Sequence, residues 1–451
     1  MTEIHVFNTA TRRREPFHPI DPRNVRLYVC GPTVYDFAHI GNARPVVVFD
    51  TFVRLLRHIF GDGHVTYARN ITDVDDRINE RARQEGVSIH DVTVRTAAQY
   101  HQDMAALNAL PPDIEPRATA HIAEMIAMIE VLIAKGHAYA AEGHVLFHVP
   151  TMPSYGDFAN RSTEELLEGA RVEVAPYKKN AGDFVLWKPS DEETPGWDSP
   201  WGRGRPGWHI ECSAMSEAHL GTTFDVHGGG LDLIFPHHQN EIAQSECAHD
   251  GAVMANYWMH NGFVVVEGEK MSKSLGNFFT VHDLLDEFPG EVIRMALLAT
   301  HYRQPLDFTR EGMRQARQSL DRWYRAVGDA EAGAMPASVI EALADDLNMP
   351  KAIAAMHALA DAALAGDRAA AGALRAAGAL TGLLQQDQEG WFRGDTGGLD
   401  AGAIETLIEQ RHQARQDRNF AEADRIRDEL ASQGIVLEDK PGGETLWRKA
   451  G

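Results

Sequence analysis

The stretch VRLYVCGP at residues 25–32 alternates apolar and polar side chains and then meets a Gly-Pro turn signal. This pattern predicts a strand that ends at the turn. Residues 40–60 are rich in Val, Phe and Leu and predict a helix, and residues 64–69 predict a second strand. Thr72 is a suitable N-cap for a following helix. The strand–helix–strand order predicts an α/β fold built on a Rossmann-like doubly wound parallel sheet.

An insertion is predicted at residues 113–200, between the two halves of this sheet. It contains a helical stretch at 118–135 and β-like runs at 145–149 and 184–188. Residues 194–208 are rich in Pro, Gly and Trp, which predicts a long irregular segment.

The second half of the chain changes composition. It becomes rich in Ala and Leu with helical periodicity, which predicts a bundle, and it ends in two helices and a hairpin that predict a small α+β domain. We therefore expect a catalytic domain in two halves (1–112 and 201–260), separated by the insertion (connective) domain (113–200). A region bearing a lysine-rich loop (261–310), a helical bundle (311–390) and a C-terminal domain (400–451) follow.

The composition favours an ordinary water-soluble protein, with 451 residues, 44% hydrophobic and 24% charged. The N-terminus lacks a secretory signal, and no stretch approaches the ~18 apolar residues of a membrane helix. We therefore expect a cytoplasmic protein with no membrane partner. The net charge of −22 argues against nucleic acid as a partner, unless a local basic surface overrules it.

The tetrapeptide His39-Ile-Gly-Asn42 follows the first predicted strand and turn and begins the helix. Free N–H groups at a helix N-terminus bind anions, and Gly41 permits close approach of a nucleotide to the backbone. His39 can donate to phosphate oxygens. The alternative is a capped helix with an exposed histidine.

A second polar segment, Lys270-Met-Ser-Lys-Ser274, follows a β-like run and has two lysines and two hydroxyls. Lysine acts in such loops as a flexible charge on a phosphate, although charged loops are usually solvated surface. The two segments, in this order and about 230 residues apart, resemble the signature pair of class I aminoacyl-tRNA synthetases.

A group of potential metal ligands is the third feature. His237 and Glu241 are spaced i, i+4 on a predicted helix, and Cys30 lies at a strand end, where ligands bind in open α/β sheets. Zinc takes Cys, His and carboxylate ligands. Cys212 completes a set of four, but His238 and Cys247 are also available. The alternative is that the cysteines are buried structural residues and the His–Glu pair lies on a helix surface.

Five segments resemble the cysteinyl-tRNA synthetases, and the resemblance runs essentially the full length of the chain. These segments are CGPTVYD at 30–36, NITDVDD at 70–76, GWHIECSAM at 207–215, HGGG at 227–230 and FPHHQNE at 235–241. The resemblance implies one zinc ion bound by Cys30, Cys212, His237 and Glu241. Two positions depart from the family pattern: Asn42 replaces a frequent histidine, and Gln239 replaces a common glutamate.

The resemblance implies an enzyme that activates L-cysteine with ATP and Mg²⁺ to cysteinyl-adenylate and transfers it to the terminal adenosine of tRNA(Cys), as a monomer. Catalytic roles fall to His39, Asn42, Lys270 and Lys273. The residues implied to contact ATP are Thr33, His39, Gly41, Asn42, Gly229, Gly230, Asp232 and Lys273. Those implied to contact the substrate cysteine are Gly31, Thr72 and Trp208. We expect the substrate sulfur to bind zinc, because size alone separates near-isosteres by only about 10²-fold.

The tail concentrates arginines among acidic residues, which favours either nucleic-acid binding or a solvated helical face. The resemblance implies anticodon contacts by Arg415, Phe420, Asp424 and Asp439. Two other functions remain open: a mycothiol-type cysteine ligase that acts on an amino-sugar inositol, and a non-catalytic paralogue that binds tRNA or senses zinc. The tail after residue 402 argues against the first, and His39, Lys270 and Lys273 argue against the second.

Overall fold

A four-stranded parallel sheet forms the centre of the molecule. The structure is a computed structural model that describes residues 2–160, 175–271, 277–393, 401–439 and 445–449. The strand order is β10-β9-β3-β4, and every neighbouring pair is parallel. The strands are β3 (Val25–Val29), β4 (Val65–Arg69), β9 (Phe224–Gly230) and β10 (Ala255–Asn261). The predicted doubly wound parallel sheet is confirmed.

The order of the strands places a topological switch point between β3 and β9. The chain runs from β3 through α1 (Ile40–Phe60) to β4 on one side, and from β9 through α7 (Gln239–Ala248) to β10 on the other. Strand β9 packs closely against α1, because a Cβ on Gly228 would collide with the ring of Phe49. Only glycine therefore fits at residue 228. Ligands of doubly wound sheets bind at the carboxyl ends of strands that flank such a point.

The prediction of Thr72 as a helix N-cap is wrong. Helix α2 (Asp76–Glu85) begins later, and the side chain of Asp75 caps it by accepting a hydrogen bond from the Arg77 N–H at 2.7 Å. Thr72 instead continues the extended chain after β4, because its N–H donates to the Pro32 carbonyl at 3.1 Å. The Thr72 side chain is therefore available to the strand ends rather than to a helix terminus.

The insertion forms its own antiparallel sheet, β5-β6-β7-β8, beside α4 (Ile122–Ala134). Its strands are β5 (Ala138–Ala141), β6 (His144–Phe147), β7 (Phe184–Pro189) and β8 (Gly204–Pro206). Strand β8 lies within the segment predicted to be irregular, and it extends this sheet beyond residue 200. Glycine and proline are unusual in strands, but a Cβ on Gly204 would collide with the indole of Trp187, so this position requires glycine.

Buried Arg44 ties the start of α1 to the region that carries the second signature. Its guanidinium donates to the carbonyls of Gly262 at 2.8 Å, Phe263 at 3.0 Å and Gln304 at 2.8 Å. Burial lowers the pKa of Arg44 to about 10. The elements of this region are β11 (Val264–Val266), β12 (Glu269–Lys270), α8 (Val281–Leu285), α9 (Gly290–Leu297) and β13 (Leu306–Phe308).

The predicted helical half and the C-terminal hairpin are both present. The bundle consists of α10 (Arg310–Val327), α11 (Ala337–Ala344), α12 (Met349–Leu364), α13 (Arg368–Thr381) and α14 (Gln388–Arg393). The C-terminal unit contains α15 (Ala401–Gln416), α16 (Phe420–Ser432), β14 (Ile435–Asp439) and β15 (Thr445–Lys449). Further elements are the hairpin of β1 (His5–Asn8) and β2 (Arg13–Pro16), α3 (Ile89–Ala106) and α6 (Trp208–Leu220).

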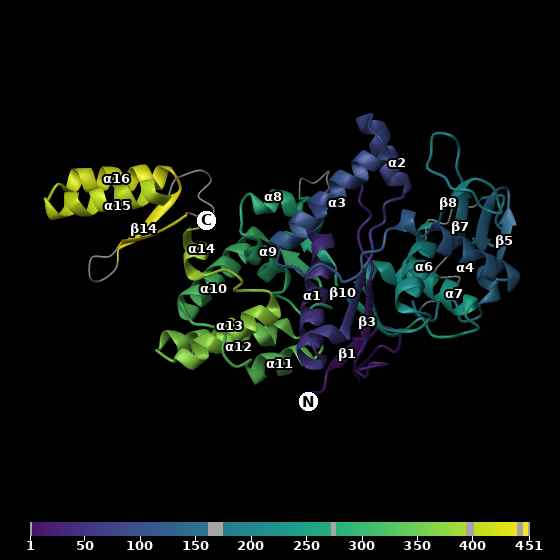
Figure 1. Cartoon of the computed structure of the whole chain (residues 1–451), viewed down its shortest axis with the longest axis horizontal. Helices are drawn as coiled ribbons and strands as arrows, with labels where there is room; N and C mark the ends of the chain where they lie inside the picture. Colours follow the sequence, from purple (N-terminus) through teal and green to yellow (C-terminus); the bar gives the residue numbers. More distant parts are fainter. Residues whose placement is uncertain (1, 161–174, 272–276, 394–400, 440–444, 450–451) are drawn as a thin grey trace.

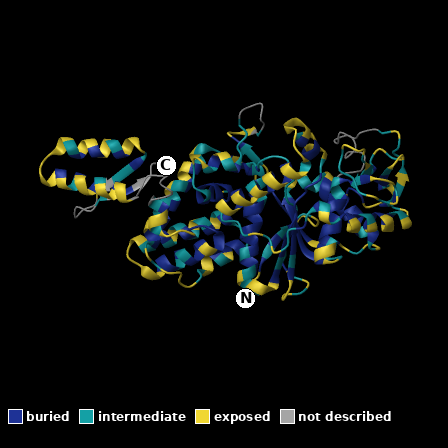
Figure 2. Ribbon diagram, turned by 45° about the horizontal axis from the view of Figure 1, so that its top comes forward, coloured by how far each residue is buried: buried dark blue, intermediate teal, exposed yellow. Residues whose placement is uncertain are grey.

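The molecule is elongated, with the insertion at one end and the C-terminal unit at the other (Figure 1). The buried residues concentrate in the central sheet and around it, whereas the two C-terminal helices present mostly exposed residues (Figure 2). None of the helices in the described ranges is both long and apolar enough to span a membrane.

Candidate active site and metal centre

The candidate site begins where β3 and β4 end beside each other. The Gly31 N–H donates to the side-chain oxygen of Asn70 at 2.8 Å. A Cβ at residue 31 would collide with the backbone carbonyl of Asn70, so only glycine permits the two strand ends to approach this closely. Cys30 therefore lies beside this tight junction, and its N–H donates to the Gly228 carbonyl of β9 at 3.1 Å.

Four potential ligands meet at this junction. Cys30 follows β3, Cys212 lies on α6 (Trp208–Leu220), and His237 lies in the helical turn that leads into α7, which carries Glu241. Their ligand atoms all lie within 4.8 Å of one another. The Cys30 and Cys212 sulfurs are 3.8 Å apart, and His237 Nε2 is 3.0 Å from Glu241 Oε1. The sequence-predicted metal ligands are thus brought together, and three of them are fully buried.

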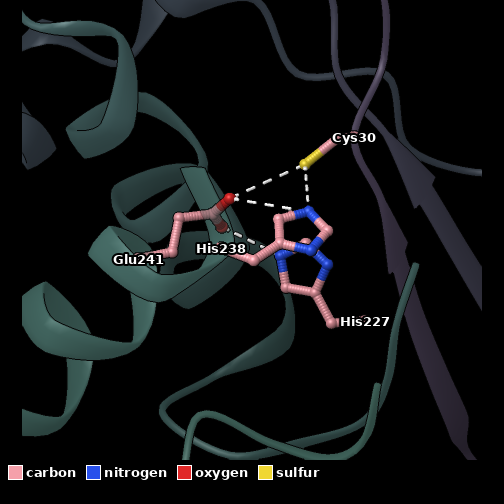
Figure 3. Close-up of side chains that lie close together, drawn as sticks. All are labelled: Cys30, His227, His238 and Glu241. Atoms are coloured by element: carbon pink, nitrogen blue, oxygen red, sulfur yellow. Dashed lines mark hydrogen bonds and ion pairs between the residues drawn. The ribbon is translucent and has the colours of Figure 1, made fainter. Parts of the chain in front are cut away.

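A second set of potential ligands shares two members with the first. Figure 3 shows Cys30 and Glu241 together with His227 and His238. His238 Nε2 lies 3.3 Å from the Cys30 sulfur, and His227 Nε2 lies 2.8 Å from Glu241 Oε2. Cys247, the remaining cysteine, belongs to neither group, and burial raises its pKa to about 11.

The charges in the cluster are those of a cation site. The hydrogen bond from Cys30 lowers the pKa of Cys212 to about 6, whereas burial and the contact with Cys212 raise the pKa of Cys30. Burial opposes ionisation of Glu241, but His227 and His237 hold its pKa well below the ordinary range. Burial also opposes protonation of His237, but Glu241 raises its pKa to about 10. These shifts favour a Cys212 thiolate, a Glu241 carboxylate and a protonated His237 side by side, away from water.

This donor set fits zinc. Zinc prefers thiolate, imidazole and carboxylate ligands, and buried charges of this kind are normally paired or bound to metal. A ligating histidine usually uses its second ring nitrogen for a hydrogen bond that orients the ring. His237 has this arrangement, because its Nδ1 lies 2.9 Å from Nδ1 of His209 while its Nε2 faces Glu241.

The first signature lies against the segment that follows the second signature in the chain. The Ile40 N–H donates to the Phe279 carbonyl at 3.2 Å, and the Val281 N–H donates to the Ala38 carbonyl at 2.8 Å. The His39 N–H donates to Asn42 Oδ1 at 3.2 Å, so Asn42 helps to cap α1. Lys270 is the last residue of β12, and Lys273 lies outside the described residues.

The methionine of the second signature also reaches the first. A Cβ on Gly41 would lie 3.6 Å from the Met271 methyl group, and it would press on the His39 ring. The ring of His39 meets Phe278 edge-on, with centroids 5.3 Å apart. A side chain at residue 41 would therefore displace the His39 ring, and it would lie in ordinary contact with Met271.

The glycine-rich end of β9 borders the same edge of the sheet. A Cβ on Gly229 would press against Leu233 and His238, and a Cβ on Gly230 would collide with the Asp232 carboxylate. Asp232 itself is exposed. Beyond the ends of β3 and β4, Thr33 pairs with Thr72 through a parallel backbone bridge. Thr33, Gly229, Gly230 and Asp232, predicted to contact ATP, thus lie near the carboxyl ends of β3 and β9.

The residues predicted to bind the substrate cysteine adjoin the ligand cluster. The indole of Trp208 stacks on the His237 ring, with centroids 4.1 Å apart and an interplanar angle of 15°. The Thr72 hydroxyl donates to Glu211 Oε2 at 2.8 Å. Burial and the Cys212 sulfur raise the pKa of Glu211 well above its ordinary range.

Three polar residues beside the cluster are absent from the sequence-based site: Asn70, His209 and Glu211. Two of them flank known site positions in the chain, since His209 follows Trp208 and Glu211 precedes Cys212. A position next to a site residue in the sequence does not predict that a side chain faces the site, because neighbours on a helix point in different directions. Their side chains reach the site only because α6 is buried on most of its surface.

In the C-terminal unit, two arginines hold one carboxylate. Arg411 donates to both oxygens of Asp439, at 2.8 and 2.9 Å, and Arg415 donates to one of them at 2.8 Å. The hydrogen bond from Arg411 lowers the pKa of Asp439. Phe420 is 62% exposed, and Asp424 pairs with Arg427 at 3.4 Å. Thus Arg415 and Asp439 share one cluster, while Phe420 and Asp424 lie on α16.

Comparisons with known proteins match two parts of the chain to described families. Residues 16–318 match the family described as tRNA synthetases class I (C) catalytic domain, and residues 396–448 match the cysteinyl-tRNA ligase anticodon binding domain. A methionyl-tRNA synthetase from Mycobacterium tuberculosis in complex with methionyl-adenylate shares the fold, with a TM-score of 0.53 and 15% identity over 80% of this chain and 82% of that chain.

Full-length relatives are much more similar. Cysteine–tRNA ligase from Rhodospirillum centenum is 62% identical over 99% of this chain and 100% of the relative. Cysteine–tRNA ligase from Acidiphilium cryptum is also 62% identical, over 100% of both chains. With its catalytic and anticodon-binding regions both matched, the chain belongs to the cysteine–tRNA ligase family of class I aminoacyl-tRNA synthetases.

Proposed function

We propose that the protein activates L-cysteine with ATP and transfers the cysteinyl group to the 3′-terminal adenosine of tRNA(Cys). The observation that carries this proposal is the buried Cys30, Cys212, His237 and Glu241 cluster, which lies at the switch point of a class I synthetase fold. A thiol-seeking centre in the amino-acid pocket of such a fold selects cysteine.

Zinc would be held by Cys30, Cys212, His237 and Glu241. When bound, it supplies a Lewis-acid position that prefers a thiol to the hydroxyl of serine. His209 orients the His237 ring, and His227 orients Glu241 through its 2.8 Å hydrogen bond.

Activation joins the cysteine carboxylate to the α-phosphate of ATP, and the bond to the departing pyrophosphate breaks. His39 and Asn42 bind phosphate at the start of α1, Lys273 stabilises the transition-state charge, and Lys270 assists. The remaining contacts with MgATP come from Thr33, Gly41, Gly229, Gly230 and Asp232. Positioning and charge stabilisation supply most of the rate enhancement for such a step.

The domain roles follow from the arrangement of the chain. The region at 261–310 contacts the tRNA stem, and the domain at 400–451 binds the anticodon. This C-terminal domain lies at the opposite end of the molecule from the insertion at 113–200 (Figure 1). The insertion is short for a hydrolytic editing module, consistent with selection of cysteine by the metal centre. All proposed site residues come from one chain, so a monomer suffices, and its place is the cytoplasm, with the translation machinery.

The two other functions are not favoured. An amino-sugar ligase has no use for the region that matches an anticodon-binding domain. A non-catalytic paralogue has no use for the two phosphate-binding signatures with His39, Lys270 and Lys273.

Replacing Arg415 with alanine is expected to raise the KM for tRNA about 10-fold without changing cysteine activation. The Arg415 side chain is 48% exposed, and Arg411 retains Asp439 in the variant, so the hairpin stays in place. Loss of one phosphate contact also lowers the slope of log K against log salt by about 0.7–0.9. Aminoacylation and pyrophosphate exchange measured on one preparation test this result. Arg368→Ala, which removes an exposed arginine in the bundle, is the control.

The proposed activation step is tested by ATP–pyrophosphate exchange with the purified protein. Exchange that depends on cysteine and is at least about 10³-fold weaker with serine is the expected result. Exchange that serine supports as well as cysteine, or no exchange with cysteine, would contradict the proposed activation.

A further inference from the structure

Three polar side chains form a hydrogen-bonded chain between α3 and α8. The side-chain amide of Gln99 on α3 donates to Asp103 Oδ1 at 2.8 Å and lies 3.1 Å from Nδ1 of His282 on α8. An amide nitrogen carries two hydrogens, and a ring nitrogen of neutral histidine accepts one. His282 Nδ1 is itself 3.9 Å from Asp103 Oδ1, too far for a hydrogen bond. Gln99 therefore joins the two residues, and the contact needs no charge on His282.

The carboxyl group of Asp103 keeps the Gln99 amide in this orientation. Asp103 is 1% exposed, and burial raises the pKa of its carboxyl group. Its Oδ2 atom is buried and has no hydrogen-bond partner among the described residues. A buried polar group is costly when its hydrogen bonds are missing, so the bond from Gln99 to Oδ1 supports the buried carboxyl group. Gln99 is thus a fixed donor on the surface of α3 that faces α8.

His282 lies where α8 meets the first signature. Two backbone hydrogen bonds join residues 38–40 to residues 279–281, and His39 is the bridged residue of the first segment. The next side chain, His282, meets the Phe37 ring edge-on, with centroids 5.4 Å apart and an interplanar angle of 69°. His282 therefore contacts α3 on one side and the residue two places before His39 on the other.

We propose that His282 and Gln99 are positioning residues that set the place of His39 in the activation step. The inference rests on the proposed function, in which His39 binds phosphate, and adds two residues to it. Because residues 38–40 are bridged to the segment that leads into His282, a shift of α8 relative to α3 moves His39 as well. A displacement of about 1 Å in an active site lowers the rate by about 10²-fold, so a smaller shift still has a measurable effect.

The test follows single-turnover formation of cysteinyl-adenylate by the zinc-loaded full chain. His282→Phe keeps a ring beside Phe37 and removes the acceptor for Gln99. We expect the rate constant of adenylate formation to fall about 10-fold, an effect between the loss of one hydrogen bond and a 1 Å displacement. The dissociation constant for cysteine, measured by calorimetry, should stay within about twofold of the wild-type value, because the amino-acid pocket lies at the junction of β3, β4 and α6.

A conservative variant separates this role from a general effect on folding. Asparagine carries an acceptor oxygen two bonds from Cβ, as histidine carries Nδ1, so His282→Asn should retain the Gln99 bond and a rate within about threefold of the wild type. His90→Phe, which replaces an exposed histidine in the first turn of α3, is the matched control and should have wild-type kinetics. Thermal unfolding of every variant is measured in parallel.

A wild-type rate in His282→Phe, or equal losses in His282→Phe and His282→Asn, would overturn this inference while leaving the proposed function intact. A loss of cysteine affinity as large as the loss of rate would also overturn it, because the substitution would then disturb the whole site. A wild-type chain that forms no cysteinyl-adenylate would overturn the proposed function, and the inference with it.

Discussion

Replacing Cys212 with alanine is expected to abolish stoichiometric zinc binding and to lower kcat/KM for cysteine activation by at least about 10³-fold. Cys212 supplies the sulfur whose pKa lies at about 6, so the variant loses the thiolate of the cluster. A bound metal ion contributes several kcal/mol, and each 1.4 kcal/mol corresponds to a factor of ten. Cysteine-over-serine discrimination should fall to about 10²-fold or less, the level that size selection reaches. Zinc analysis and pyrophosphate exchange with both amino acids measure these changes.

Cys247→Ala is the matched control for the loss of a thiol. Cys247 packs against the same core but lies in neither ligand group, so its variant should retain zinc and activity. A Cys212→Ala protein that still prefers cysteine to serine as the wild type does would show that the cluster does not select the substrate.

Replacing His39 with alanine is expected to lower kcat for cysteine activation about 10²- to 10³-fold and to leave the affinity for cysteine unchanged. His39 precedes α1 and lies beside the segment that follows the second signature, whereas the amino-acid pocket lies at the junction of β3, β4 and α6. Removing one donor that stabilises transition-state charge has an effect of this size. Single-turnover adenylate formation and cysteine binding by calorimetry separate the two quantities.

The backbone around His39 should survive this substitution. The Ile40 N–H remains bonded to the Phe279 carbonyl, and Asn42 still caps the helix start. His58→Ala, at the exposed opposite end of α1, is the control and should have wild-type kinetics. Equal losses in kcat and in cysteine affinity would instead indicate that His39 supports the fold of the whole site.

The elements that depend on local patterns could be predicted from the sequence. The alternation at residues 25–29, the helical run at 40–60 and the C-terminal hairpin all appear where the residue types favour them. The strand at 204–206 could not be predicted, because glycine and proline disfavour strands and the reason for Gly204 is a tryptophan 17 residues earlier. The N-cap prediction for Thr72 is wrong for a similar reason. The hydroxyl that suits threonine to an N-cap can also bond a distant carboxylate, as it does with Glu211.

The candidate site also contains features that local sequence patterns predict and features that depend on packing. The i, i+4 spacing predicts that His237 and Glu241 face each other, and they lie 3.0 Å apart. The approach of Cys30 to Cys212 depends instead on how a strand end and a helix from distant parts of the chain pack together. No spacing rule contains that information. The fold excludes Cys247 from the ligand groups, whereas His238 lies in the second of them. Glu211 gives no sequence signal, because a glutamate on a helix is normally solvated.

The most direct test of the central claim is the charging of tRNA. Purified protein is incubated with ATP, Mg²⁺, labelled cysteine and total tRNA, and the acid-precipitable label is counted. We predict that label accumulates on tRNA, that unlabelled cysteine competes with it and that serine does not. Cysteine-dependent pyrophosphate exchange without any label on tRNA would contradict the account, because the protein would then activate cysteine for a different acceptor.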